Sequence, residues 1–206
     1  MTQQVTFDVI TDASVTAAKL ATGAAVSNIG ASGITSNELA ASAVTPAKIA
    51  QPLTQGTAAA TTSGTAIDFT SIPSWVKRIT VVFNGVSVSG TANILIRLGT
   101  SGGVEATGYL AQVNAFNNTP SGAADTTGAI FTWANTAASV WNGVMHIVNV
   151  SGNSWIASGT AMTSVVGSTS IFAASKTVGA TLDRIRLTTT NGTDTFDAGS
   201  INILYE

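Results

Sequence analysis

The fold is decided by an alternating stretch, Lys77-Arg78-Ile79-Thr80-Val81-Val82-Phe83. Successive side chains of a β-strand point to opposite faces, so Ile79, Val81 and Phe83 share one face and the polar residues take the other. The same period of two returns at residues 201–205. It also returns at residues 94–98, where only Leu95 and Arg97 oppose the other three side chains. The pattern predicts strands at three widely separated points of the chain.

Other segments have the same character and are separated by turn-forming residues. The further predicted strands are residues 144–150, 154–157, 170–173 and 182–189. The turn signals are Asn84-Gly85, Ser89-Gly90, Ser101-Gly102-Gly103, Ser151-Gly152 and Asn191-Gly192. Many short strands with regular turns predict an all-β domain over residues 55–206, an antiparallel sandwich of jelly-roll type. Several strands are aliphatic on both faces, which fits either sandwich cores or an outer face covered by neighbouring subunits.

The composition excludes several classes of protein. Hydrophobic residues make up 45% of the 206 residues and charged residues 9%, with a formal net charge of -2. No nucleic-acid partner is expected, because phosphate binding needs clustered Lys and Arg. The absence of cysteine excludes a disulfide scaffold and a thiolate metal site. We see neither a signal peptide nor an apolar run long enough to span a bilayer, so no membrane insertion is expected.

A repeat sets the N-terminal part of the chain apart. Its clear units, 15–24, 34–43 and 44–53, each place an aliphatic residue before a Thr and another four positions after it. The Thr can cap a helix, and the two aliphatic residues have hydrophobic-staple spacing. A ten-residue repeat turns the apolar stripe of a helix by roughly 80° per unit. We therefore expect an extended segment of short helical turns over residues 15–54.

Such turns bury too little apolar surface to be ordered alone. Identical copies packed around a symmetry axis would supply the missing surface. The residues expected at this axis are Val15, Leu20, Ile34, Leu39, Val44 and Ile49.

Two parts of the chain resemble a known family. The three repeat units resemble repeats of bacteriophage tail-fibre and head-fibre proteins. The stretch Leu182-Asp183-Arg184-Ile185-Arg186-Leu187-Thr188-Thr189, the sequence at 191–203 and the phrase Ile72-Pro73-Ser74-Trp75-Val76-Lys77-Arg78-Ile79-Thr80 resemble the terminal part of such fibre proteins.

The resemblance implies a homotrimeric structural protein on the virion surface, made in the cytoplasm of the bacterial host. It implies that the six axial residues form a trimer interface and that residues 1–14 attach the fibre to other virion proteins, with the β-domain outward. A tail fibre that touches a host glycan or protein is the first expectation. A head fibre or decoration protein on the capsid stays open.

Catalysis has few candidate residues, and no enzyme activity, cofactor or metal site is expected. His146 is the one histidine, and alternation places it on the same face as Val144, Val148 and Val150. A structural role is expected for it, either packed and hydrogen-bonded or stacked near a symmetry axis. A glycan-degrading fibre enzyme is the lesser alternative, because glycoside hydrolysis normally needs two carboxyl groups and Glu105 is the only glutamate in the β-domain before Glu206. A host-encoded adhesin or carbohydrate-binding module is disfavoured by the missing signal peptide and by the repeats.

Acidic and aromatic residues give weaker signals. Near the C-terminus, Asp183, Asp194 and Asp197 match no calcium loop and are expected to shape turns, with Asp183 also able to pair with an arginine. Exposed aromatic rings commonly bind sugars, and the loop at 114–128 is a plausible distal surface. The candidates for receptor or partner contact are Trp133, Trp141, Phe116, Asn117 and Asn118.

Overall fold

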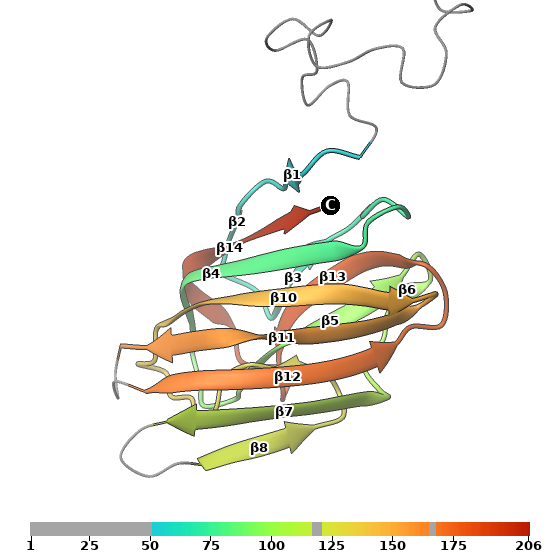
Figure 1. Cartoon of the computed structure of the whole chain (residues 1–206). Coiled ribbons are helices and arrows are strands. Elements are labelled where there is room, and N and C mark those ends of the chain that lie inside the picture. The colour runs from blue at the N-terminus through green and yellow to red at the C-terminus, as the bar shows by residue number, and fades with distance from the viewer. Residues whose placement is uncertain (1–50, 117–120, 165–167) are drawn as a thin grey trace, which may run out of the picture. The chain divides into compact units, whose positions relative to one another are not determined.

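A computed structural model of the chain describes residues 51–116, 121–164 and 168–206. All regular elements within these ranges are β-strands, and the strands pair antiparallel in two sheets (Figure 1). The prediction of an all-β antiparallel domain is confirmed. The compact unit spans Ala50–Glu206.

The larger sheet has nine strands in the order β1-β14-β4-β10-β11-β12-β7-β8, with β2 also paired to β14. Figure 1 shows its long strands lying side by side across the front of the domain. Their bounds are β1 Thr54–Gln55, β2 Ala59–Ala60, β4 Arg78–Val88, β7 Tyr109–Phe116, β8 Ser121–Asp125, β10 Trp141–Ser151, β11 Ser154–Thr163, β12 Thr169–Thr177 and β14 Phe196–Tyr205.

The smaller sheet has five strands in the order β3-β13-β5-β6, with β9 also paired to β5. Their bounds are β3 Ala66–Phe69, β5 Ile94–Thr100, β6 Gly103–Val104, β9 Ala129–Ile130 and β13 Leu182–Thr189. Each segment predicted as a strand overlaps one of the observed strands, and the segment at 182–189 coincides with β13. The alternation of side chains was therefore a sound guide to these elements.

One apolar core fills the space between the two sheets. Phe83 of β4 and Phe172 of β12 reach it from the larger sheet, and Ile185 and Leu187 of β13 reach it from the smaller. Phe131, which follows β9, stacks on Phe83 with ring centroids 4.2 Å apart and lies 6.0 Å from Phe172. Aromatic rings from different strands thus join the two layers at the centre of the domain.

Strand β5 explains one of the patterns with aliphatic residues on both faces. Ile94 and Ile96 point into the core, and Leu95 on the opposite face is also fully buried. The segment around Gly128 lies against Leu95, because a Cβ built on Gly128 would approach Leu95 Cδ1 to 2.5 Å. The second apolar face of β5 is therefore covered by the same chain, and no other subunit is needed there.

Several predictions fall on residues that the structure does not describe. The helical turns of residues 15–50 and the axial residues Val15, Leu20, Ile34, Leu39, Val44 and Ile49 lie outside the described residues. The described part begins at residue 51, and Thr54 of β1 already pairs with Tyr205 of β14.

Candidate functional site: the outer face of the larger sheet

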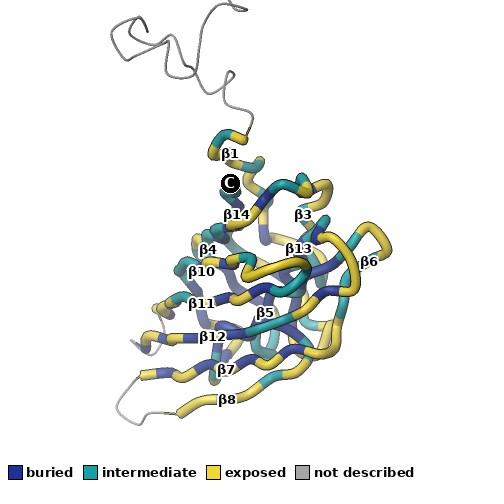
Figure 2. The backbone as a smooth tube through the Cα atoms, turned by 45° about the vertical axis from the view of Figure 1, so that its right-hand side comes forward, coloured by how far each residue is buried: buried dark blue, intermediate teal, exposed yellow. Residues whose placement is uncertain are grey.

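Four central strands of the larger sheet turn one row of side chains to the core and the next row outward. In β7 every second residue from Tyr109 is buried and the residues between them are exposed. Figure 2 shows the same change of colour along β11, β12 and β7. The outward positions, which we call the outer face, are Asn142, Val144, His146, Val148 and Val150 of β10; Ser154, Ile156, Ser158, Thr160 and Met162 of β11; Thr169, Ile171, Ala173, Ser175 and Thr177 of β12; and Leu110, Gln112, Asn114 and Phe116 of β7.

The outer face carries almost no ionisable group. His146 is the one ionisable side chain among its positions, and no Lys, Arg, Asp or Glu occurs there. Lys176 of β12 does not contribute, because its side chain is 8% exposed and its Nζ lies over the inward-facing ring of Tyr109. A solvated sheet face normally alternates apolar core positions with polar and charged outward ones. This face departs from that rule.

The same face holds the exposed apolar side chains of the domain. Apart from Leu53, every large hydrophobic side chain that is exposed among the described residues belongs to it. These are Leu110, Phe116, Val148, Val150, Ile156, Met162 and Ile171. Contiguous apolar patches of more than a few hundred Å² are rare on monomeric proteins and mark interaction sites.

Strand register arranges the outer face in ridges and a trough. One row runs across the sheet from Val148 to its pairing partner Ile156, then through the small Ser175 to Leu110. In the next row, Ser158 lies opposite Ala173. The small side chains of Ser175 and Ala173 leave an open hollow of about 400 Å³ beside Ile156 and Leu110, and a second of about 320 Å³ lies beside Met162. The surface therefore has relief that a second apolar surface can fill.

The smaller sheet presents the opposite character. Register aligns Asp68 of β3, Arg186 of β13 and Arg97 of β5 in one row across it. The Arg186 guanidinium makes two hydrogen bonds to the Asp68 carboxylate, of 2.7 and 2.6 Å. Arg184 pairs with Asp183 at 2.9 Å. These partly exposed charges are typical of a surface that stays in water.

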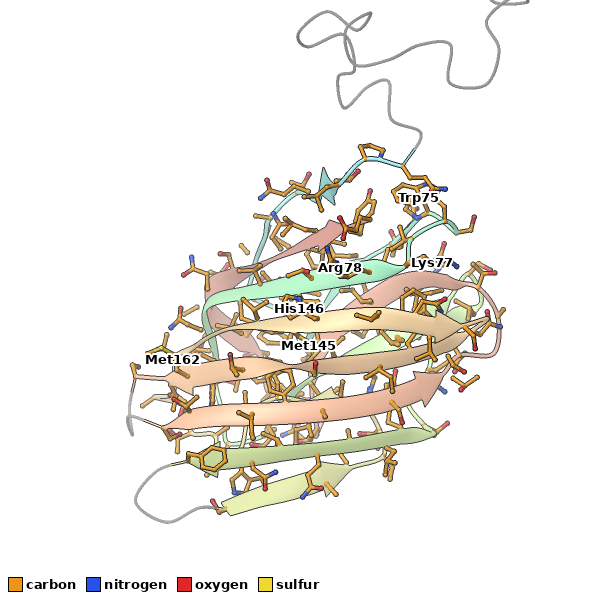
Figure 3. The ribbon with its side chains drawn as sticks, in the orientation of Figure 1. Trp75, Lys77, Arg78, Met145, His146 and Met162 are labelled. Atoms are coloured by element: carbon orange, nitrogen blue, oxygen red, sulfur yellow. The ribbon has the colours of Figure 1, made fainter. Side chains whose placement is uncertain are left out.

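His146 occupies the outward position that alternation predicts, beside Val144 and Val148 (Figure 3). It is exposed in the single chain, so the expectation of a packed ring is not met there. Its Nδ1 lies 3.2 Å from Thr80 Oγ1. Among the described residues, no carboxylate hydrogen-bonds to the imidazole, so no catalytic triad is assembled around it.

The prediction that Trp141 contacts a receptor is wrong. Trp141 is 1% exposed and begins β10 in phase with the buried Met145 and Ile147. Its indole Nε1 donates a hydrogen bond of 2.8 Å to Asn135 Oδ1. The two-residue spacing back from Met145 and Ile147 was the sequence signal for this burial, and the loop-like composition around Trp141 obscured it.

Two other aromatic candidates remain at the surface. Phe116 ends β7 and is 49% exposed, but it belongs to the outer face. Trp133 is half-buried against the core, and its Nε1 donates to Ser121 Oγ at 3.0 Å. Asn117 and Asn118 lie outside the described residues.

A partly buried ion pair ties the far end of β12 to the chain after β6. Lys176 Nζ lies 2.6 Å from Glu105 Oε2, and Glu105 Oε1 also accepts a hydrogen bond from Gly179 N. Burial works against the charged form of Glu105, but the bonds from Lys176 and Gly179 outweigh it and hold the pKa of Glu105 below its usual range. Burial raises the pKa of the neighbouring Tyr109 phenol. The cluster is a structural strap, since each charged group in it has a partner.

Of the three acidic residues near the C-terminus, Asp194 has the turn-shaping role that the sequence predicts, whereas Asp183 lies in β13 and Asp197 in β14. Asp194 Oδ2 accepts a hydrogen bond from Ala92 N, and its Oδ1 accepts one from Asn191 Nδ2. These bonds hold the pKa of Asp194 below its ordinary value. Within the described ranges no group of three or more His, Asp or Glu side chains is placed to hold a metal ion, and no helix is long and apolar enough to cross a membrane.

The outer face as a whole was only partly visible in the sequence. The aliphatic residues on both faces of several strands indicated that some outward faces would be covered, but not which ones. Covering by the same chain at Leu95 and exposure at Ile156 look alike in sequence. Comparison with family models, with curated proteins and with solved structures finds no match for this chain.

Proposed function

We propose that this chain is a structural protein of a bacteriophage virion, forming a short trimeric fibre on the particle surface. Its N-terminal segment attaches the fibre to other virion proteins, and its β-domain projects outward. The chain is not an enzyme, and it carries no cofactor.

The observation that carries the proposal is the uncharged, apolar outer face of the larger sheet. A domain that exposes Ile156, Met162 and Leu110 on one face of a sheet has a surface suited to association. The strands behind this face present no group of residues arranged for catalysis among those described. Association, and not chemistry, is the role that the surface supports.

The remaining parts of the chain agree with this role. The repeat units at 15–24, 34–43 and 44–53 resemble those of phage fibres, and their capped helical turns need copies of themselves to be ordered. The β-domain passes repeatedly from one sheet to the other, as from β3 to β4 to β5 and later from β12 to β13 to β14. Such crossings are typical of jelly-roll sandwiches, and we assign the domain to that type.

Two locations on the particle are compatible with such a fibre. A tail fibre that touches the host is our first proposal, with Trp133 as the aromatic residue that remains available to a receptor. A head fibre or decoration protein on the capsid is the alternative.

The experiment that tests the proposal is to locate the chain on intact particles of the phage that encodes it. Gold-labelled antibodies against residues 55–206 should decorate the particle surface in electron micrographs, at the tail for a tail fibre and over the head for a capsid fibre. Particles lacking the chain should adsorb poorly to host cells in the first case and normally in the second. Purified particles that carry none of the chain would overturn the proposal.

A further inference from the structure

We infer that further copies of the same chain cover the outer face of the larger sheet, leaving the charged surface of the smaller sheet in water. The inference rests on the proposed oligomeric fibre and deepens it, because it assigns the contact to particular strands of the β-domain. The copies are then held together by two contacts, one through the N-terminal repeats and one through the outer face.

The lack of charged side chains on the outer face indicates that this face becomes buried against a partner. Placing a charged group in an interface costs free energy unless it finds a partner, so surfaces that become buried avoid Lys, Arg, Asp and Glu. The outer face follows this rule, with His146 as its one ionisable group. The row of Asp68, Arg186 and Arg97 on the smaller sheet does not. The outer face of the larger sheet is thus suited to burial in an interface, and the surface of the smaller sheet is suited to contact with water.

The size of the outer face suits a stable contact between proteins. Strands lie about 4.8 Å apart and rise about 3.4 Å per residue, so four strands of about ten residues cover roughly 650 Å² in projection. Stable interfaces bury about 800 Å² on each partner. The side-chain relief of the face adds to the projected area, and the uncharged surface ends on β4, where Arg78 lies opposite Val148 and pairs with Glu206.

The relief of the face suits a second copy of itself. Val148, Ile156 and Leu110 project beside the hollow over Ser175 and Ala173, so the same surface offers both the projecting side chains and the space to receive them. Closed homo-oligomers commonly use surfaces that contain their own complement. A glycan is commonly held by stacking on exposed rings, and Phe116 is the only aromatic ring at the outward positions described apart from the imidazole of His146. A lipid surface would be helped by Lys or Arg on the face, which has neither.

The experiment measures the solvent access of single cysteines, which the natural sequence lacks. Ser158→Cys places a thiol at the centre of the outer face, and Ser101→Cys places one at the exposed turn between β5 and β6 as the matched control. In the full-length oligomer, a maleimide reagent should label position 158 at least tenfold more slowly than position 101. In denaturant the two rates should become equal.

A second pair of variants tests the same face without relying on reactivity. Ser158→Arg should reduce the mass in light scattering toward that of a single 20.7 kDa chain or weaken association at least tenfold, while Ser101→Arg keeps the parent mass. Far-ultraviolet circular dichroism checks that each variant keeps its β-structure. If Ser158→Arg does not fold, the cysteine rates alone decide.

The outcomes separate this inference from the fibre proposal. An oligomer in which Cys labelling at 158 is as fast as at 101 overturns the inference and leaves the fibre in place. A full-length chain that stays monomeric at micromolar concentration also overturns it, and antibody labelling of particles still decides whether the chain is on the virion. Protection at 158 that appears only when phospholipid vesicles are added would identify a membrane as the partner and would equally overturn it.

Discussion

The Trp141 indole and the Asn135 side chain form a hydrogen-bonded pair inside the domain, with Nε1 and Oδ1 2.8 Å apart. Asn135 is 5% exposed, and its Nδ2 donates in turn to Ala92 O at 2.7 Å. One amide thus satisfies a buried indole at the start of β10 and a backbone carbonyl just before β5. The pair joins the larger sheet to the smaller sheet at one end of the sandwich.

Replacing the amide should therefore destabilise the domain. Asn135→Ala leaves the Trp141 N–H and the Ala92 carbonyl without their partner, which costs about 2 kcal/mol for a buried group. For a chain of this size we expect the melting temperature to fall by roughly 4–8 °C. Differential scanning calorimetry at fixed protein concentration measures it. Equal stability of Asn135→Ala and the parent would contradict the assignment.

At Gly159 the larger sheet has no room for a side chain. It lies in β11 opposite Met145, and a Cβ there would come within 2.0 Å of Val144 O and 2.8 Å of Phe172 Cζ. The carbonyl belongs to the backbone and cannot move aside without breaking the ladder. We expect Gly159→Ala to lower the free energy of unfolding by about 1–3 kcal/mol or more.

The control for this prediction is Gly102→Ala in the turn between β5 and β6. The nearest atom to a Cβ at Gly102 is Thr100 Oγ1 at 3.5 Å, which is ordinary contact. Thermal unfolding of both variants should show a large fall for Gly159→Ala and a change of less than about 0.5 kcal/mol for Gly102→Ala. Similar melting temperatures for the two variants would show that β10 and β11 can separate to admit a methyl group.

Much of the fold could be predicted from the sequence because apolar and polar residues alternate along a strand that has one buried face. Residues 77–83 and 182–189 carry that pattern, and they became β4 and β13. The pairing of distant strands carries no local signal. That β12 lies beside β7, more than fifty residues earlier, follows from which apolar faces must meet in the core and from how the turns bring them together.

The site could be predicted less well than the fold. Loop-like composition around Trp141 suggested an exposed ring, whereas its spacing from Met145 and Ile147 placed it in the core. The outer face is spread over four strands, so each strand shows only two or three of its apolar residues. Exposure of Ile156 and Leu110 is a property of the assembled sheet, and no single segment reveals it.

The strap between Lys176 and Glu105 should make stability depend on pH in the acid range. The pKa of Glu105 is held below the 4.5 of the unfolded chain, so its ionisation stabilises the folded state above that pH. This contribution is lost as the pH falls from about 4.5 through the lower folded-state pKa. Melting temperatures measured between pH 3 and pH 7 should show the loss.

Glu105→Gln is the matched variant for this pH dependence. At neutral pH it should be less stable than the parent by about 1 kcal/mol, because Lys176 loses its charged partner. As the pH falls below about 4.5, the parent should approach the variant, since protonated Glu105 resembles glutamine. A stability difference that stays constant across this range would show that the ion pair does not couple folding to protonation.

Phe116 and Trp133 should separate the two kinds of contact that a fibre makes. Phe116 lies on the outer face opposite Thr169, whereas Trp133 packs at the edge of the core and bonds Ser121. If copies of the chain cover the outer face, Phe116→Ala should weaken self-association about tenfold, as removal of a buried aromatic anchor does. Light scattering over a dilution series measures this effect.

Trp133→Ala should instead leave the mass unchanged and reduce host-cell adsorption by about tenfold if its indole ring is a receptor contact. Ser121→Ala removes only the hydrogen bond from Trp133 Nε1 and keeps the ring, so it serves as the control for local disturbance. Adsorption is measured with fluorescently labelled full-length protein on host cells. A loss of adsorption with Phe116→Ala at unchanged mass would move the receptor contact to the outer face and argue that this face is not covered by other copies.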